Sequence, residues 1–316
     1  MQPLGGLLVV DLTRYLPGPF ASRELLRLGA RVVRLESPEG DPLRSIAPTW
    51  DEALNAGKES VVCDLKADPA LGRALCARAD VVLEGFRPGV AERLGLGPRD
   101  LPDTVVYCSI TGFGADGVHA LRVGHDLNYM GWAGALADTA PGMPAVQAAD
   151  LAAGALAAVT QILAALLDRE RTGRGAHLVV SMTHGAHRLV AHRLDGEPVP
   201  RLLTGGAACY GIYLTADGRW LTVAALEPAF WRRLCELLGR EDLVERQWEP
   251  DLPELAALLA SRPLSAWLEI FADEDVAVGP VATLAEAAPD FGEPAPSTPP
   301  PALGEHTAEW RLELGL

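Results

Sequence analysis

Short apolar segments alternate with helical patterns over the first third of the chain, and this rhythm constrains the fold more than any other feature. Helices are predicted at Phe20–Leu28, which Gly29 ends, and at Ala70–Arg78. The predicted strands are Leu7–Leu12, Arg31–Glu36, Ser60–Leu65, Asp80–Glu84 and Thr104–Ile110. Such alternation predicts an α/β fold, with a mostly parallel sheet covered by helices on both faces.

A second pattern begins near Gly205. Two short strands, Tyr210–Leu214 and Trp220–Val223, flank a turn and predict a hairpin, and helices are predicted at 228–238 and 252–258. Residues 285–302 are rich in proline and alanine, which favours an extended surface segment. A short helix, Glu305–Leu314, is predicted to end the chain.

Composition excludes several classes of partner. The formal net charge is −15, which argues against a nucleic-acid coat or a general binder of membrane surfaces. The longest apolar segment, Leu151–Leu167, contains polar residues and ends in a charged run, so we predict a buried helix and no membrane span. The five cysteines form no C-x-x-C pair, and no secretory signal is visible, so a reduced cytoplasm is expected.

Common nucleotide and nucleophile motifs are missing from the expected turns. The turn after the first predicted strand reads Tyr15-Leu16-Pro17-Gly18-Pro19, not G-x-G-x-x-G. The sequence also holds no lysine loop of the P-loop type and no G-x-S-x-G elbow.

Three residues stand out as candidates for acid–base chemistry. His125 lies in the polar hexapeptide 124–129, Asp150 precedes the long apolar helix, and Glu227 follows an apolar strand. Each has a structural alternative: a satisfied histidine at a helix start for His125, an N-cap for Asp150, and a first-turn acid for Glu227. The helix after Asp150 would also offer free N–H groups to a developing oxyanion.

Basic residues lie at or near the ends of predicted strands in an otherwise acidic chain. They are Arg34, Lys58, Lys66, Arg87 and Arg93. Ligands of open α/β sheets bind beyond the carboxyl ends of the strands, so converging cations there would suit a polyphosphate. Scattered surface cations are the alternative. His177, His184, His187 and His192 resemble a cluster, but the pair His184 and His187 has no acidic partner within a helical turn, and no metal site is expected.

Ordered sequence blocks cover nearly the whole chain. They are Leu8–Leu12, Pro17–Phe20, Leu28–Glu36, Gly57–Ser60, Asp64–Lys66, Glu84–Val90, Arg93–Gly97, Thr111–Gly114, Asp168–Gly175, Gly205–Gly206, Thr215–Gly218 and Gly304–Thr307. The set resembles the family III CoA-transferase (CaiB/BaiF-type) superfamily. The hexapeptide Gly124–Tyr129 is similar to the Gly-His-Asp-x-Asn-Tyr marker of its α-methylacyl-CoA racemase branch.

The resemblance implies roles for individual residues. His125 and Asp150 match the two proton-transfer residues, and Glu227 matches an acid near that histidine. The segments Cys63–Lys66 and Gly85–Arg87, together with Arg93, match segments that contact CoA. The full set of candidate substrate and CoA contacts is Arg34, Cys63, Asp64, Leu65, Lys66, Gly85, Phe86, Arg87, Arg93, Gly124, Asp126, Leu127, Asn128 and Tyr129.

The resemblance also implies an architecture. It implies a large Rossmann-like domain built from both termini (1–190 and 286–316), a linker (191–204) and a smaller middle α+β domain (205–285) in an interlocked homodimer. The stretch from Met182 to Gly205 is about a dozen residues shorter than the usual link between the domains, which could alter this interlocking. Ser37 stands where racemases often have an arginine near CoA, and Val179 replaces a usual acid.

The expected activity is epimerisation of 2-methylacyl-CoA thioesters. A proton leaves the carbon next to the thioester and returns on the opposite face, which requires two acid–base groups and no metal or redox cofactor, CoA being part of the substrate. Two alternatives stay open. In a CoA-transferase, Asp150 would form an acyl anhydride. In a non-catalytic acyl-CoA-binding protein, the thioester would bind without exchanging its α-hydrogen.

Overall fold

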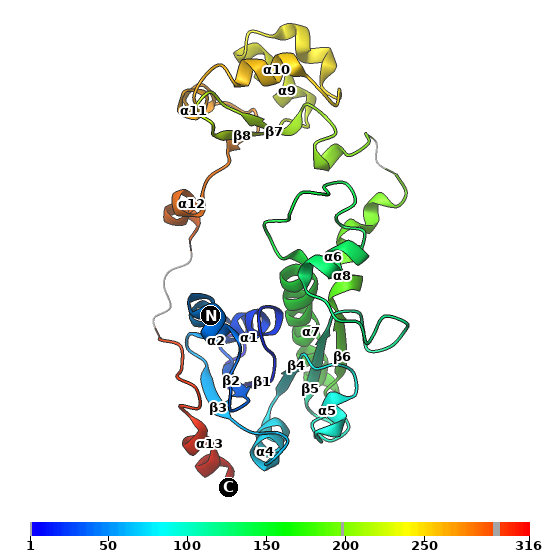
Figure 1. The fold of residues 1–316 in the computed structure, drawn as a ribbon, viewed down its shortest axis with the longest axis vertical. Helices are drawn as coiled ribbons and strands as arrows, with labels where there is room; N and C mark the ends of the chain where they lie inside the picture. The colour runs from blue at the N-terminus through cyan, green and yellow to red at the C-terminus, as the bar shows by residue number, and fades with distance from the viewer. Residues whose placement is uncertain (1, 197–198, 293–297) are drawn as a thin grey trace. The chain divides into compact units, whose positions relative to one another are not determined.

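The computed structural model describes residues 2–196, 199–292 and 298–316 and divides into two compact units. The larger unit comprises Met1–Ala137, Gly142–Ala191 and Ala295–Leu316, and the smaller comprises Asp138–Pro141 and His192–Pro294. Each is described by itself. Figure 1 follows the chain through both, from the blue N-terminus to the red C-terminus.

A six-stranded, all-parallel sheet forms the centre of the larger unit. Its strands run in the order β3-β2-β1-β4-β5-β6, which is the doubly wound order with a switch point between β1 and β4. Their bounds are β1 Leu8–Asp11, β2 Arg31–Glu36, β3 Glu59–Val62, β4 Val81–Glu84, β5 Val106–Thr111 and β6 His177–Ser181. The predicted Rossmann-like α/β fold is therefore confirmed.

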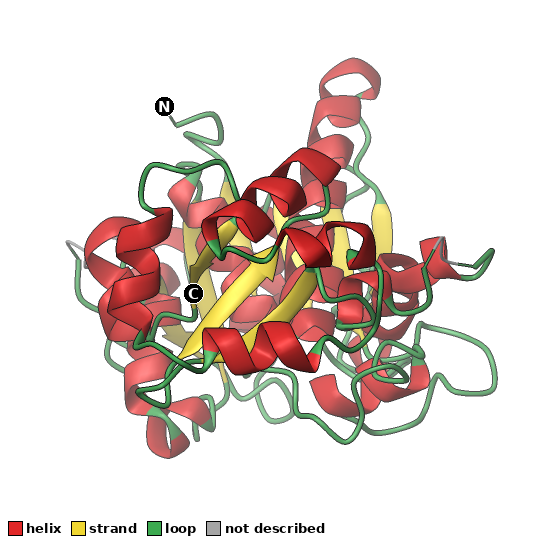
Figure 2. Ribbon diagram, turned by 90° about the horizontal axis from the view of Figure 1, so that it is seen from above, coloured by secondary structure: helices red, strands yellow, loops and turns green. Residues whose placement is uncertain are grey.

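The strands bury side chains on both faces, because helices pack against both. Figure 2 distinguishes the helices (red) from the strands (yellow). Val9, Val32 and Val81 face one core, which the helices α1 (Pro17–Arg27) and α7 (Ala157–Thr172) complete. Their neighbours Val10, Val33 and Val82 face the other core, with α4 (Ala70–Arg78) and α13 (Thr307–Leu314). This burial on both faces explains why consecutive apolar residues occur in these strands, as in Val9-Val10, Val32-Val33 and Val81-Val82.

Five further helices belong to the larger unit, and one segment has π-helical hydrogen bonding. The helices are α2 Leu43–Ile46, α3 Pro48–Asn55, α5 Val90–Arg93, α6 Asp126–Trp132 and α8 Met182–Val190, and the π-helical segment η1 is Ala149–Leu156. η1 and α7 together form the one helix among the described residues that is long and apolar enough to cross a membrane. Ala153, Ala158 and Ile162 on it are buried in the core, as expected for the interior helix predicted here.

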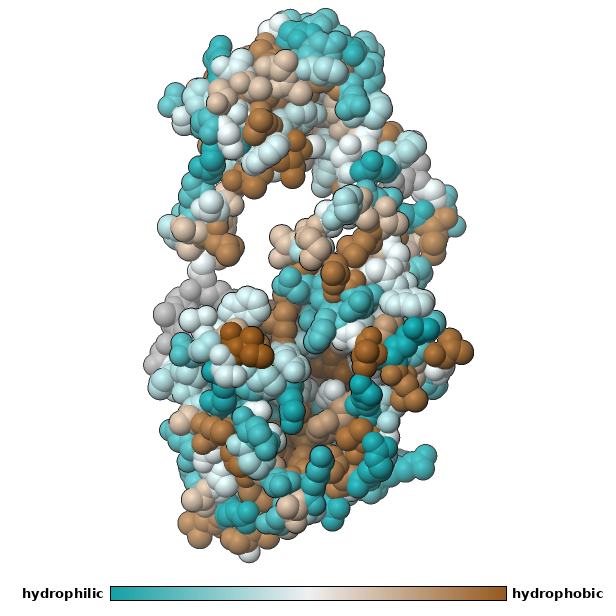
Figure 3. Space-filling model, in the orientation of Figure 1, coloured by the Kyte–Doolittle hydropathy of each residue, from teal (hydrophilic) through white to brown (hydrophobic). Residues whose placement is uncertain are grey.

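Apolar side chains on the outside are dispersed. On the view in Figure 3, brown apolar and teal polar side chains of the larger unit intermingle in small patches and form no continuous apolar belt. Scattered exposed apolar residues are normal for folded domains.

The C-terminal segment covers the outer edge of β3. Ser60 exchanges two hydrogen bonds with His306: the Ser60 N–H donates to His306 Nδ1 at 3.2 Å, and the His306 N–H donates to the Ser60 carbonyl at 2.9 Å. The Val62 N–H donates to Thr307 Oγ1 at 2.9 Å. The indole of Trp310, which is fully buried, donates to Glu59 at 2.6 Å. An edge strand that would expose unpaired groups is thus closed by residues from the far end of the sequence.

The smaller unit is an α+β domain, as predicted. Its antiparallel sheet has the order β7-β8-β9, with β7 Tyr210–Leu214, β8 Trp220–Ala224 and β9 Val278–Pro280. The short helix η2 Ala191–Arg193 spans the boundary between the units, and the helices of the smaller unit are η3 Leu202–Thr204, α9 Pro228–Leu237, η4 Glu241–Arg246, α10 Pro253–Leu259, α11 Leu264–Phe271 and α12 Leu284–Phe291. Trp231, Leu234 and Trp267 are buried in its core.

One sequence prediction is wrong here. The segment 285–302 was predicted to be extended, but it begins inside the helix α12, which a reciprocal Thr283–Glu286 capping box starts. Arg219, next to β8, pairs with Glu286 through two bonds of 3.0 and 2.9 Å. Residues 286–292 therefore belong with the smaller unit, whereas the predicted boundary gave them to the larger one. Residues 293–297 of this segment, and 197–198 of the predicted linker, lie outside the described residues.

Candidate functional site

A cavity of about 810 Å³ opens beyond the carboxyl ends of four strands of the larger unit. It is lined by Leu12 and Arg14 after β1, by residues 37–42 after β2, by Cys63–Lys66 after β3 and by Phe86 after β4. This is where ligands bind in open α/β folds. Among the predicted CoA contacts, Cys63, Asp64, Leu65, Lys66 and Phe86 line this cavity.

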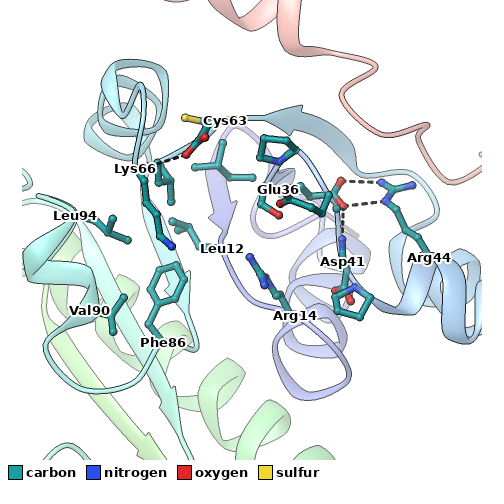
Figure 4. A pocket seen from close by; sticks show the side chains of 18 of the residues that line it. Leu12, Arg14, Glu36, Asp41, Arg44, Cys63, Lys66, Phe86, Val90 and Leu94 are labelled. Atoms are coloured by element: carbon teal, nitrogen blue, oxygen red, sulfur yellow. Dashed lines mark hydrogen bonds and ion pairs between the residues drawn. The ribbon is translucent and has the colours of Figure 1, made fainter.

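Two cations in the cavity are available for an anionic ligand. Figure 4 shows the charged ends of Lys66 and Arg14 pointing into the cavity from different sides. Neither side chain has an ion-pair partner within residues 2–196, 199–292 and 298–316. Arg44 also lines the cavity, but its guanidinium is bonded to Glu36 at 2.7 and 2.9 Å. Lys66 and Arg14 are therefore the groups suited to a phosphate.

The loop that carries Lys66 is shaped by its own acid. Asp64 Oδ1 accepts the N–H groups of Lys66 and Ala67 at 3.0 and 3.1 Å, which closes a tight turn after β3. Cys63 is buried, and burial raises the pKa of its thiol. Asp64 and Cys63 therefore shape the wall, while Lys66 supplies the charge.

Arg34 does not line the cavity, in contrast to its predicted contact with CoA. It is 1% exposed, and its guanidinium donates to both oxygens of Asp51 at 2.6 and 3.2 Å. Glu36 and Asp41 lie 3.4 and 3.3 Å from it. A guanidinium surrounded by three carboxylates is already neutralised, so its role here is structural.

Lys58, another of the predicted strand-end cations, is also buried. Its ammonium donates to the Pro19 carbonyl, Ser22 Oγ and Asn55 Oδ1 at 2.7 to 2.9 Å. Burial lowers the pKa of Lys58 to about 8, although the nearby Asp11 opposes that shift. Lys58 fastens α1 to α3 and is not open to a ligand.

Three other predicted CoA contacts lie beside the cavity wall. Gly85 and Arg87 flank Phe86, and Arg93 ends α5, whose first residue, Val90, lines the cavity. The structure does not bring these three into the wall itself.

His125 occupies the N-cap of α6 and is exposed. Its backbone N–H donates to Asn128 Oδ1 at 3.1 Å, which fixes the start of the helix. The imidazole ring lies 6.2 Å, centre to centre, from the ring of Tyr15 and nearly perpendicular to it (85°). The polar hexapeptide thus forms a helix start that presents an accessible histidine.

Tyr129 holds the hexapeptide 124–129 in place through its hydroxyl and its ring. Its hydroxyl donates to the Gly124 carbonyl, and its ring lies so close to Gly112 that a Cβ there would meet ring atoms at 2.6 Å. Burial, reinforced by the charge of Asp150, raises the pKa of Tyr129 to about 12. Leu127, the remaining member, is 43% exposed.

Asp150 is not the N-cap that the sequence suggested. Ala148 precedes the helical segment, and the N–H of Asp150 donates to Oδ1 of the buried Asp126 at 2.9 Å. Asp126 therefore caps this helix from a distance, and the N–H of Asp150 is not free to bind an oxyanion. The cause is the π-helical first turn, which places Asp150 inside the helix.

The Asp150 carboxyl has an unusual environment. Burial, and to a lesser extent the negative charge of Asp126, raises its pKa from 3.8 to about 7. A carboxyl group of this kind exchanges protons near neutral pH. The structure places the two predicted proton-transfer residues at linked positions: His125 precedes Asp126, and Asp126 holds Asp150.

Glu227 lies in the smaller unit, at the N-cap of α9, and is exposed. Its carbonyl accepts the Trp231 N–H at 3.1 Å. This position agrees with the structural alternative of an acid at a helix start.

Sequence reasoning missed three residues of this region: Arg14, Tyr15 and Asp41. Arg14 and Asp41 line the cavity, and Tyr15 contacts His125. Their signal was weak, because each lies in a turn after a strand and belongs to no motif. The Pro17-Gly18-Pro19 break next to Tyr15 was the only local indication of an unusual turn.

Comparison with known proteins agrees with this arrangement. The family model described as "CoA-transferase family III" matches residues 4–293. Alpha-methylacyl-CoA racemase of Mus musculus is 34% identical over 99% of this chain and 93% of its own length. The probable fatty acyl-CoA transferase Rv3272 of Mycobacterium tuberculosis is 34% identical over 85% of this chain and 80% of its length. A crystal structure of Rv3272 superimposes with a TM-score of 0.82, at 30% identity, over 98% of this chain and 99% of that one.

The chain belongs to CoA-transferase family III, an enzyme family. Its relatives carry both racemase and CoA-transferase names, so membership alone does not choose the reaction.

Proposed function

We propose that this protein epimerises 2-methylacyl-CoA thioesters, with His125 and Asp150 as the two acid–base groups. The single observation that carries the proposal is the Asp150 carboxyl, whose pKa lies near 7 because of burial and the adjacent Asp126. A group that both accepts and returns a proton works best when its pKa is near the working pH.

The two groups would act in sequence. One removes the proton from the carbon next to the thioester, the electron pair moves onto the thioester oxygen as an enolate, and the other group returns a proton to the opposite face. An imidazole, and a carboxyl whose pKa lies near 7, can each begin deprotonated as the base or protonated as the acid. Since Asp126 already accepts the Asp150 N–H, another donor must stabilise the enolate oxygen.

The CoA part would lie in the cavity beyond the strand ends. Lys66 and Arg14 would bind phosphate groups there, since both are unpaired in the described part of the chain and point into the cavity. Arg14 would supply a cation on the same wall as Ser37, which carries none. CoA remains part of the substrate, and the proposal requires no metal or redox cofactor. The proposed assembly is a cytoplasmic homodimer, in which Glu227 acts as a charge partner of His125.

The test is deuterium uptake at the α-carbon. Wild-type protein is incubated with (R)- and with (S)-2-methylacyl-CoA in D2O, and NMR follows exchange and inversion. We expect both enantiomers to exchange and converge, and His125→Ala and Asp150→Asn each to lower the rate at least about a hundredfold, the loss typical of a missing general acid or base. Wild-type protein that exchanges no α-proton would rule the proposal out.

A CoA-transferase is the second candidate, because one relative at 34% identity is a probable fatty acyl-CoA transferase. Asp150 would then attack the donor thioester and release CoA thiolate, leaving an acyl anhydride on the carboxylate. Hydroxylamine intercepts such an anhydride and would leave a hydroxamate on Asp150, which mass spectrometry detects after incubation with acyl-CoA. A racemase leaves Asp150 unmodified. A protein that binds acyl-CoA but neither exchanges nor forms the adduct would be a non-catalytic binder.

A further inference from the structure

Tyr15 adopts a backbone conformation that side-chain-bearing residues rarely take. Its φ is +64°, in the left-handed region, where a Cβ crowds the backbone. The residue lies in the turn between β1 and α1, directly before Leu16 and Pro17. Glycine or asparagine would fit this position with less strain, so a tyrosine here requires a reason.

A specific hydrogen bond holds the turn in this shape. The Tyr15 N–H donates to Asp41 Oδ2 at 3.0 Å. Asp41 is only 3% exposed and is itself fixed: Oδ1 accepts the Leu43 N–H at 2.9 Å, and Arg34 lies 3.3 Å from Oδ2. The strained turn is therefore attached to the buried Arg34 cluster.

The fold gains little from the tyrosine ring. The residue is 45% exposed and makes no hydrogen bond through its hydroxyl to any described residue. Its one aromatic neighbour in the described part of the chain is the His125 imidazole, 6.2 Å away and nearly perpendicular. Perpendicular ring pairs at this separation are attractive and have a defined orientation. The contact therefore restricts an otherwise exposed histidine.

We propose that Tyr15 is a positioning residue that holds the His125 imidazole for proton transfer and couples its orientation to the CoA cavity. The coupling follows from Asp41, which lines the cavity on one side and holds the Tyr15 backbone on the other. A ligand that displaces the 37–42 loop would move the turn and, with it, the ring against His125. The catalytic part rests on the function proposed above, whereas the ring contact does not.

Two substitutions separate the ring from the backbone. Tyr15→Phe keeps the ring and removes only the hydroxyl. Tyr15→Asn removes the ring but tolerates the left-handed backbone, so the turn and the fold are retained. Trp50→Ala is the matched control, because Trp50 is a 61% exposed aromatic of the same unit that lines no part of the cavity.

Two measurements are made on each variant. The first is the 1H–13C NMR spectrum of the His125 ring, assigned through His125→Ala and recorded with and without CoA. The second is kcat and KM for α-proton exchange. We expect Tyr15→Asn to shift the His125 resonances and to abolish their response to CoA, while Tyr15→Phe and Trp50→Ala leave both as in wild type.

In the kinetics, Tyr15→Asn should lower kcat about tenfold, the upper end expected for losing one perpendicular ring contact, with KM within about twofold of wild type. Tyr15→Phe should keep kcat at the wild-type value. A Tyr15→Asn protein with unchanged histidine resonances would overturn the proposal, as would an equal fall of kcat in Tyr15→Phe and Tyr15→Asn. If wild-type protein exchanged no α-proton, the proposed function would fail, and the resonances alone would still decide whether Tyr15 positions His125.

Discussion

Two clusters of charged side chains in the larger unit differ in how their charges are balanced. In the Arg34 cluster, one buried guanidinium lies among Glu36, Asp41 and Asp51, at 2.6 to 3.4 Å. In the site at α6 and η1, burial and the negative charge of Asp126 disfavour ionisation of Asp150, whose pKa rises to about 7. The first cluster is compensated, whereas the second holds two like charges together.

The difference distinguishes charged groups that stabilise the fold from charged groups that can take part in proton transfer. Burial of a paired charge serves the fold only as long as every partner is present. A carboxyl that is buried beside another carboxyl costs stability when it ionises, and that cost is what makes its proton exchangeable near neutral pH. The position of a charged residue in the sequence does not distinguish these cases, since the sequence patterns put both Arg34 and Asp150 at or near the ends of predicted elements.

The largest expected effect is on the compensated cluster. Arg34→Met leaves three buried carboxylates without their shared cation and should lower the free energy of unfolding by about 3–5 kcal/mol, the usual loss when one partner of a buried ion pair is removed. Urea unfolding followed by circular dichroism measures the change. A loss below about 1 kcal/mol would mean that the cluster is not a supporting element.

The next effect is a gain in stability on substitution, and its size depends on pH. The folded protein keeps a proton on Asp150 between pH 3.8 and about 7 that the unfolded chain has already released, so its stability should fall as the pH rises through this window. Asp150→Asn avoids that loss. It should be about as stable as wild type at pH 4 and more stable at pH 8 by about 1–4 kcal/mol, at about 1.4 kcal/mol for each unit of pKa shift.

Thermal unfolding of both proteins at pH 4, 6 and 8 measures this difference. Asp168→Asn serves as the control, because Asp168 is an exposed carboxylate and should give the same difference from wild type at every pH. A constant difference for Asp150→Asn would show that Asp150 ionises normally in the folded protein.

A smaller effect concerns ligand binding. It tests whether the cavity cations, like Asp150, serve the chemistry of the site and not the stability of the fold. Lys66→Ala should raise the Kd of CoA about tenfold, through loss of one charge-assisted contact. It should leave the melting temperature unchanged, since the described residues offer Lys66 no ion pair. Isothermal titration calorimetry gives the affinity. Arg44 lies on the same wall but is bonded to Glu36. Arg44→Met should therefore lower the free energy of unfolding more than it lowers the affinity for CoA.

The smallest effect is expected at the surface. Arg78 pairs with Glu313 at 2.9 Å, but its side chain is 50% exposed. Arg78→Met should change the free energy of unfolding by less than about 1 kcal/mol, because water screens such pairs. A loss as large as that of Arg34→Met would show that burial does not distinguish the two arginines.

Much of the fold follows from local patterns in the sequence. The strand Arg31–Glu36, the helix Ala70–Arg78 and the first hairpin strand Tyr210–Leu214 match their predicted bounds, because apolar runs, helical spacing and turn residues agree there. The sequence patterns miss the helix α12 because the prolines of the segment 285–302 outweigh the Thr283–Glu286 capping box. Pro289, inside α12, lies beyond the first turn, so proline content alone was a poor guide.

The site was predictable in its residues and not in its electrostatics. His125 and Asp150 could be singled out from sequence, yet the role of Asp126 as a remote cap depends on the chain returning to the same place 24 positions later. The burial of Arg34, and its distance from the cavity wall, depend on which face of β2 meets α3. Such facts arise from tertiary packing, which no local pattern encodes.

The closure of β3 by the C-terminal segment also sets an order of events during synthesis. Ser60 and His306 are 246 positions apart, and a ribosome adds about 5–20 residues per second, so the strand waits tens of seconds for its covering residues. Until then, the emerging Rossmann-like half has an open edge that can pair with another nascent chain. Synthesis of the larger unit thus begins before that of the smaller unit and ends after it.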